Sequence, residues 1–167
     1  MSSSGDISWP DTLKKRLPLL GHRNWIVVAD AAYPWQTAPG IETLATRGHQ
    51  IDVLREVLDA VEAAPHVRPI IYTDAELPFL REEDAPGIGN YRDELRIIFG
   101  GRPVESLPHE DIIKRLDEAG RAFHVLLLKT KLTLPYTSVF VQLDCGYWNA
   151  QAERRLRADF QPKPSPA

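Results

Sequence analysis

Short apolar runs rich in β-forming residues alternate along this chain with segments whose apolar residues recur at helical spacing. The predicted strands are residues 25–29, 69–73, 123–128 and 138–143, and the predicted helices lie near residues 9–20, 51–64, 90–99, 109–120 and 148–160. A helix that lies between two strands crosses over the sheet and covers one of its faces. The alternation therefore predicts an α/β fold, a three-layer α/β/α sandwich whose sheet is covered on both faces.

The length of the chain, 167 residues, suits one domain with a full hydrophobic core. We expect residues 1–8 to be a flexible N-terminus and residues 9–160 to form a single domain that includes a C-terminal extension. Residues 161–167 are polar and rich in proline, and this composition predicts a disordered tail.

Charge and hydropathy argue against two classes of partner. A net charge of −3 and a pI near 5.9 provide no positive field for nucleic acid or for an anionic membrane surface. No stretch reaches the length and apolar character of a membrane span, and the N-terminus lacks the apolar core of a signal peptide. We therefore expect a cytoplasmic protein that binds neither nucleic acid nor membrane.

The sequence also carries no pattern typical of a metal or cofactor site. Cys145 is the only cysteine, so neither an internal disulfide nor a cysteine-based zinc cluster is expected. The histidines do not follow metal-ligand spacing, and Gly87 and Gly89 lack the strand-to-helix context of a dinucleotide fingerprint. We expect no bound metal and no cofactor.

Two residues near the first predicted strand have side chains suited to chemistry. His22 lies between the end of a predicted helix and that strand, and imidazole both gives and takes a proton near neutral pH. Its alternative role is to cap the terminal carbonyls of the preceding helix. Asp30 follows the strand, where ligands of open α/β sheets gather, although it could equally accept hydrogen bonds from the loop that follows it.

Two further candidates lie in the second half of the chain. His109 lies at the start of a predicted helix, where the helix dipole favours neutral imidazole, although exposed histidines are common there. Tyr136 offers a phenol that donates or accepts a hydrogen bond, although tyrosine packed against proline explains the neighbouring Pro135 as well.

These residues belong to segments that resemble the D-ribose pyranase and L-fucose mutarotase family. Residues 20–22 (Leu-Gly-His) and the apolar run 25–31, which ends in Ala-Asp-Ala, are similar to the opening of that family. Residues 108–110 (Pro-His-Glu) resemble the His-Glu pair of the ribose branch. Residues 135–138 (Pro-Tyr-Thr-Ser) resemble the family's Pro-Tyr-Ala-Asn before its last strand. The resemblance covers roughly residues 9–146.

The resemblance implies a cofactor-independent isomerase that interconverts ring or anomeric forms of a monosaccharide by acid–base catalysis. It makes His22 the catalytic proton donor and acceptor. The residues that it assigns to substrate binding are Asp30, His109, Tyr136 and Ser138. It also implies a ring-shaped homo-oligomer, an octamer or a decamer, whose pockets lie near the subunit contacts.

The sequence also departs from this family. Ser138 stands where the family has asparagine, residues 74–89 form an acidic loop with no clear counterpart, and the region beyond Trp148 is additional. Two alternatives therefore stay open. One is a non-catalytic sugar-binding or regulatory module on the same fold, and the other is an isomerase that acts on a sugar acid or another small carbonyl compound.

Overall fold

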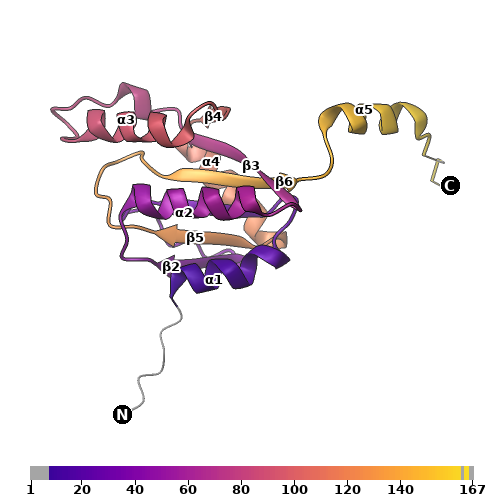
Figure 1. Ribbon diagram of the computed structural model, residues 1–167, viewed down its shortest axis with the longest axis horizontal. Coiled ribbons are helices and arrows are strands. Elements are labelled where there is room, and N and C mark those ends of the chain that lie inside the picture. Colours follow the sequence, from indigo (N-terminus) through magenta and orange to yellow (C-terminus); the bar gives the residue numbers. More distant parts are fainter. Residues whose placement is uncertain (1–7, 163, 166–167) are drawn as a thin grey trace, which may run out of the picture.

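A computed structural model describes residues 8–162, 164 and 165 of the chain (Figure 1). Of the flexible N-terminus expected for residues 1–8, all but Ser8 lies outside this description, and of the disordered tail expected for residues 161–167, residues 163, 166 and 167 lie outside it. In the described part of the chain, no helix has the length and apolar character needed to cross a membrane.

The strands form one six-stranded sheet in the order β2-β5-β1-β6-β3-β4. Their bounds are β1 Trp25–Ala29, β2 Ile41–Ala45, β3 Val67–Asp74, β4 Val104–Leu107, β5 Val125–Lys129 and β6 Val139–Cys145. Strand β6 runs antiparallel to both of its neighbours, β1 and β3, and the other pairs are parallel. The N-terminal end of β6 therefore lies at the same edge of the sheet as the C-terminal ends of β1 and β3.

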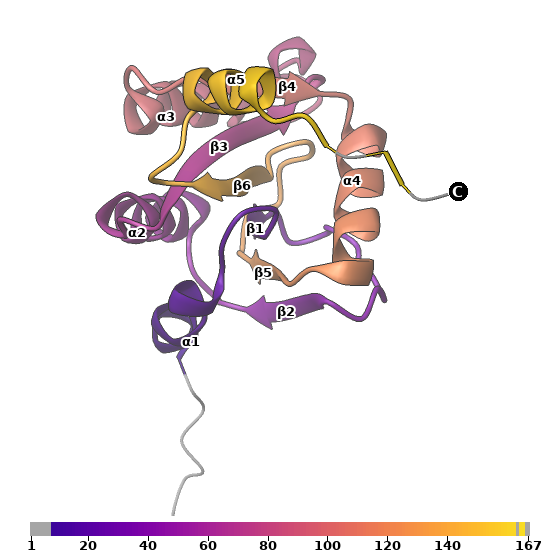
Figure 2. The ribbon, with the colours of Figure 1, turned by 90° about the vertical axis from the view of Figure 1, so that its right-hand side faces the viewer.

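Helices cover both faces of the sheet, as predicted (Figure 2). The helices are α1 Trp9–Arg16, α2 Gln50–Ala63, α3 Ile88–Phe99, α4 His109–Ala122 and α5 Ala150–Asp159, with 3-10 turns at Leu17–Leu19 and Leu77–Phe79. Alternate residues of a strand point to opposite faces, so β1 contributes side chains to two apolar cores, one on each face of the sheet. Ile26 and Val28 pack with α1, α2 and α3, whereas Val27 packs with α4.

The two edge strands, β2 and β4, were not among the predicted strands. Both are short, and β2 is only partly buried while β4 is largely exposed, so neither carries a continuous apolar run. Edge strands bury less side-chain surface than central ones, which weakens their sequence signal. The predicted C-terminal helix is present as α5, but none of its residues is buried and it extends away from the sheet (Figure 1).

Gly40 fixes the position of α4 through a close backbone contact. Its N–H donates to the carbonyl oxygen of Gly120 in α4 at 2.6 Å, and its own carbonyl accepts from the N–H of Val125 at 2.8 Å. A Cβ atom at residue 40 would lie 2.6 Å from the Gly120 oxygen and nearer still to that of Phe123. Backbone atoms cannot rotate away from such a contact, so this position requires glycine.

We therefore expect Gly40→Ala to lower the free energy of unfolding by about 2 kcal/mol or more, the cost of overpacking an ordered contact. Gly101→Ala is the matched control, since a Cβ atom there meets no other atom within 4 Å. It should change stability by no more than about 0.5 kcal/mol. Urea unfolding of both variants measures the difference, and equal midpoints would contradict the close contact.

Candidate functional site

A cleft opens at the edge of the sheet where β1 and β3 end and β6 begins. Its volume is about 420 Å³, and its walls are the loop after β1, the first residue of α4 and the loop between β5 and β6. The lining residues are Asp30, Ala31, Ala32, Tyr33, Pro34, His109, Thr133, Leu134, Pro135 and Tyr136. Open α/β sheets gather ligands at this edge, so the cleft is the candidate site.

Asp30 and Ser138 form two hydrogen bonds with each other at this end of the sheet. The Ser138 hydroxyl donates to Oδ1 of Asp30 at 2.6 Å, and the Asp30 N–H donates to the same hydroxyl oxygen at 3.1 Å. Ser138 is buried, whereas Asp30 is half-buried and lines the cleft. One carboxylate oxygen of Asp30 is thus held by the protein, and no hydrogen bond within the described chain occupies the other.

His109 is oriented by two acidic residues that come from the end of β3 and the loop after it. Its Nδ1 lies 3.0 Å from each carboxylate oxygen of Asp74, and its backbone N–H donates to the carboxylate of Glu76 at 3.0 and 3.1 Å. Asp74 is fully buried. Burial raises the pKa of Asp74 to about 6, although the adjacent His109 acts in the opposite direction and lowers it.

Aromatic rings surround the His109 imidazole on two sides. Tyr136 meets it edge to face with ring centroids 5.4 Å apart, and buried Tyr33 does so at 6.4 Å. Tyr136 adopts a left-handed backbone with φ 58°, which is costly for a residue with a side chain. Burial, with nearby Asp74 and Asp30, raises the pKa of Tyr33 well above its usual value, so its phenol stays protonated.

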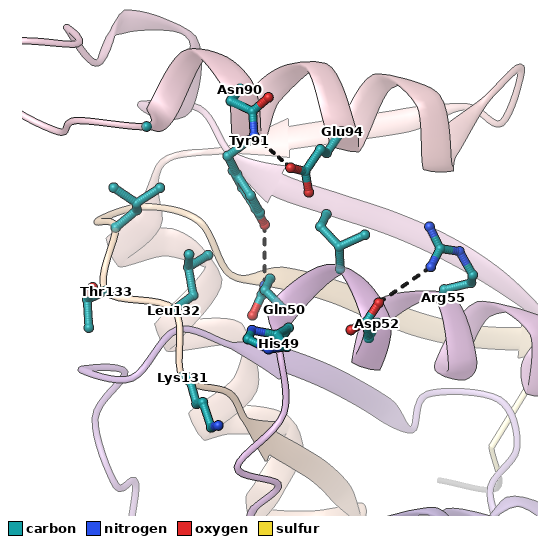
Figure 3. A pocket seen from close by; sticks show the side chains of 13 residues that line it. His49, Gln50, Asp52, Arg55, Asn90, Tyr91, Glu94, Lys131, Leu132 and Thr133 are labelled. Carbon is teal, nitrogen blue, oxygen red and sulfur yellow. Dashed lines mark hydrogen bonds and ion pairs between the residues drawn. The ribbon is translucent and has the colours of Figure 1, made fainter.

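The loop that carries Tyr136 is anchored from the other side by Gln50, the first residue of α2. The Gln50 amide donates to the carbonyls of Val28 and Thr137, both at 3.0 Å, and its oxygen accepts from the Thr130 hydroxyl at 2.6 Å. The Tyr91 hydroxyl also donates to the Thr137 carbonyl, at 2.5 Å. Figure 3 shows Gln50 and Tyr91 pointing toward each other from α2 and α3.

A second cavity, of about 460 Å³, lies on this far side of the loop (Figure 3). Thr133 and Leu134 line both cavities, so the loop between β5 and β6 is a thin wall between them. The polar side chains around the second cavity largely pair with one another, as Asn90 does with Glu94 at 2.7 Å. None of the five predicted site residues lines it.

His22 does not join the other four predicted residues within one chain. It precedes β1 at the opposite edge of the sheet, its side chain is 61% exposed, and its Nδ1 lies 3.0 Å from Oδ1 of Asp144. The five residues of β1 separate it from Asp30, a span of roughly 16 Å at the usual strand rise. Asp30, Ser138, His109 and Tyr136 lie together at the cleft edge, and His22 lies apart from them.

The surroundings of His22 also rule out its alternative role as a helix cap. The Nε2 atom of His66 occupies that position instead, 3.0 and 3.1 Å from the carbonyl oxygens of Leu17 and Leu20. His22 lines a surface hollow of about 650 Å³ together with Tyr147 and Trp148, which are 79% and 44% exposed.

Sequence reasoning missed three residues that shape the cleft. Asp74 was placed at the start of a surface loop, but it is the last residue of β3 and fully buried, because β3 pairs through this position with Leu107. A carboxylate closing an apolar strand, as Asp30 does after β1, was the signal that could have revealed it. Tyr33 and Gln50 carry no comparable sequence signal, since only the folded chain shows what they contact.

The described residues contain no group of three or more His, Cys, Asp or Glu side chains arranged to hold a metal ion. The cleft carries several acid–base groups. These are one imidazole backed by a buried carboxylate, a second carboxylate and a phenol. Such a set binds hydroxyl groups and moves protons.

No protein-family model matches this sequence, and no curated protein sequence matches it either. Solved structures do match. The structure of Bacillus subtilis RbsD complexed with D-ribose is 21% identical with a TM-score of 0.57, covering 86% of this chain and 98% of its own. The fucose mutarotase of Streptococcus pneumoniae in complex with L-fucose is 23% identical with a TM-score of 0.55, covering 83% and 93%.

FucU from Bifidobacterium longum matches as well, at 16% identity and a TM-score of 0.55, over 80% of this chain and 92% of its own. Each match spans nearly the whole of the solved protein, so the likeness concerns a complete domain. The chain therefore has the fold of RbsD and of the fucose mutarotase.

Proposed function

We propose that this protein interconverts ring or anomeric forms of a monosaccharide without a cofactor. The observation that carries the proposal is the meeting of Asp30, His109 and Tyr136 in one cleft, with Ser138 behind Asp30. These side chains come from three separate stretches of the chain and form a hydroxyl-binding, proton-moving set. The fold supports the same reading, because solved proteins that share it are described with D-ribose and L-fucose.

The reaction needs only acid–base chemistry. The anomeric hydroxyl loses a proton, the bond from the anomeric carbon to the ring oxygen breaks, and the ring oxygen gains a proton. Rotation and the reverse steps then give the other form. Asp30 would accept hydrogen bonds from sugar hydroxyls, and Tyr136, 38% exposed, would add a further hydrogen bond or an aromatic contact. Ser138 would orient the Asp30 carboxylate through its hydroxyl.

His22 enters this proposal through a second copy of the chain. Because His22 and the cleft of its own chain lie at opposite ends of β1, His22 could reach only the cleft of a neighbouring copy. Tyr147 and Trp148, exposed beside His22, supply aromatic surface of the kind enriched at interfaces. Phe140, in the strand that precedes them, is fully buried in the core and adds nothing to this surface. We propose a closed homo-oligomer, an octamer or a decamer, in which His22 serves as proton donor and acceptor.

A non-catalytic sugar-binding module is the second candidate. Its support is the same separation of His22 from the cleft, together with the burial of Ser138 against Asp30. Such a module would bind a sugar in the cleft and leave its exchange rate unchanged. Measurement of exchange separates the two.

In the first experiment, NMR saturation transfer between anomeric signals is recorded for a panel that includes ribose and fucose. We expect at least one sugar to exchange faster with the protein than in buffer, because positioned acid–base groups accelerate ring opening by roughly two to four orders of magnitude. Binding without faster exchange would select the sugar-binding module. No effect on any sugar would remove the enzyme reading.

His22→Ala should lower the accelerated exchange by roughly two to four orders of magnitude and leave the fold intact, because the side chain is largely exposed. His49→Ala is the matched control, since His49 is also exposed and its side chain makes no cap hydrogen bond at the start of α2. That control should retain the rate within about threefold. Unchanged exchange in a folded His22 variant would assign the reaction to other groups.

Mixing of variants tests whether two copies share each site. His22→Ala and Asp30→Asn should each be inactive, and co-expression of the two should restore roughly a quarter of the sites when assembly is random. Co-expression of His22→Ala with a variant carrying both changes is the control and should restore none. Light scattering after size exclusion should show a closed oligomer, and a monomer at micromolar concentration would contradict the shared site.

A further inference from the structure

We propose that Asp74 is a positioning residue that holds the His109 imidazole in one tautomer, so that His109 takes the proton of the sugar's anomeric hydroxyl. This inference rests on the proposed sugar chemistry and goes beyond it. The resemblance assigns His109 to sugar contact only, and it assigns no role to Asp74.

The geometry fixes where the imidazole proton lies. Both carboxylate oxygens of Asp74 are 3.0 Å from Nδ1 of His109, and a carboxylate can only accept a hydrogen bond. Nδ1 therefore carries the proton, and in the neutral ring Nε2 keeps a free lone pair. Nε2 makes no hydrogen bond to any described residue, and His109 lines the cleft. The site thus offers a proton acceptor to a bound hydroxyl group.

Burial of Asp74 is difficult to explain by stability alone. The residue has no exposed surface, and burial of a carboxylate costs several kcal/mol unless it is paired and hydrogen-bonded. Its partner is not a permanently charged arginine but an imidazole at the wall of a cleft. A carboxylate behind a cleft histidine fixes the ring and stabilises the imidazolium that forms when Nε2 takes a proton.

The groups that face Asp74 agree with this role. They are His109 from α4, Glu76 after β3, and Asp30 and Tyr33 after β1. Glu76 accepts the backbone N–H of His109 and thereby fixes the start of α4, but it makes no hydrogen bond to the ring. The protonated Tyr33 phenol is already used, since it donates to Gln36 at 2.7 Å. Asp74 is therefore the acidic group that controls the ring itself.

Ring opening transfers one proton from the sugar to His109 and one proton from His22 to the sugar. Nε2 of His109 takes the proton of the anomeric hydroxyl, and the electron pair of that O–H bond becomes the second bond of the new carbonyl group. The bond between the anomeric carbon and the ring oxygen breaks, and its electron pair goes to the ring oxygen. That oxygen receives a proton from His22 of a second copy, in its protonated form, and the reverse steps close the ring and restore both histidines.

The direct test measures the tautomer of His109 in the protein without sugar. Long-range ¹H–¹⁵N correlation of protein labelled with ¹⁵N-histidine should show His109 protonated on Nδ1 and unprotonated on Nε2 at pH 7.5. Asp74→Asn should abolish this fixed tautomer, because the amide can donate to Nδ1 as well as accept from it. Asp111→Asn, which removes a charge from an exposed side chain in the first turn of α4, should leave the tautomer unchanged.

Two results would overturn the inference. One is a wild-type protein in which His109 is protonated on Nε2, and the other is an Asp74→Asn variant in which His109 keeps the wild-type tautomer. This readout needs no sugar, so it is separate from the proposed function. If Asp74→Asn fails to fold, the wild-type tautomer and its change with pH still decide the question.

The second readout is sugar exchange as a function of pH. Asp74→Asn should lower the accelerated exchange by roughly 10²- to 10⁴-fold, while Asp111→Asn should stay within about threefold of the wild type. With the pKa of Asp74 near 6, wild-type exchange should fall as the pH is lowered through that value and Asp74 takes up a proton. A wild-type rate that rises toward pH 5, or an Asp74→Asn variant as active as Asp111→Asn, would contradict the role. Absence of exchange in the wild type would reject the proposed function, whereas the tautomer would still be measured.

Discussion

The buried amide of Gln50 is the contact on which the arrangement of the cleft depends. From the first turn of α2 it binds the carbonyl of Val28 in β1, the carbonyl of Thr137 before β6 and the hydroxyl of Thr130 after β5. These three segments are central to the sheet and far apart in sequence. Only a side chain with two donors and an acceptor satisfies all of them, and each group left unpaired in this buried place would cost about 1–3 kcal/mol. The amide thus fixes the loop between β5 and β6 relative to the end of β1.

That loop carries a strained residue, and the anchor explains how the strain is maintained. Tyr136 holds a left-handed backbone, a conformation that costs on the order of 1 kcal/mol for a residue with a side chain. The next residue, Thr137, is held at three points: its hydroxyl donates to the Leu134 carbonyl at 2.6 Å, and its carbonyl accepts from Gln50 and Tyr91. The backbone turns sharply at Tyr136 because its neighbour cannot move. The result is a phenol directed across the His109 ring and a hydroxyl at Ser138 directed at Asp30.

The sequence predicted the layers of the fold and the central strands because these carry strong apolar patterns. It also predicted that Asp30 follows an apolar strand, where ligands of open α/β sheets gather, and that His109 begins a helix, because the ends of strands and the starts of helices leave recognisable signals. It did not predict β2 and β4, which lie at the sheet edges and bury little. Asp74 and Gln50 were missed for a different reason. Asp74 contacts His109, which lies 35 residues away in the sequence, and Gln50 contacts Thr137, which lies 87 residues away. Local periodicity carries no information about such distant pairs.

The direction of the strands restricts how this chain can use all of its candidate residues. A β-strand is stiff and extended, so residues at its two ends cannot meet, and β1 places His22 and Asp30 at opposite ends. Strand β6 repeats the constraint, since Ser138 directly precedes it at the cleft and Asp144, the partner of His22, lies near its opposite end. No rearrangement of loops removes this separation while the sheet stays intact. Chemistry that uses His22 together with the cleft must therefore join two molecules, whereas the pair of His109 and Asp74 is complete within one.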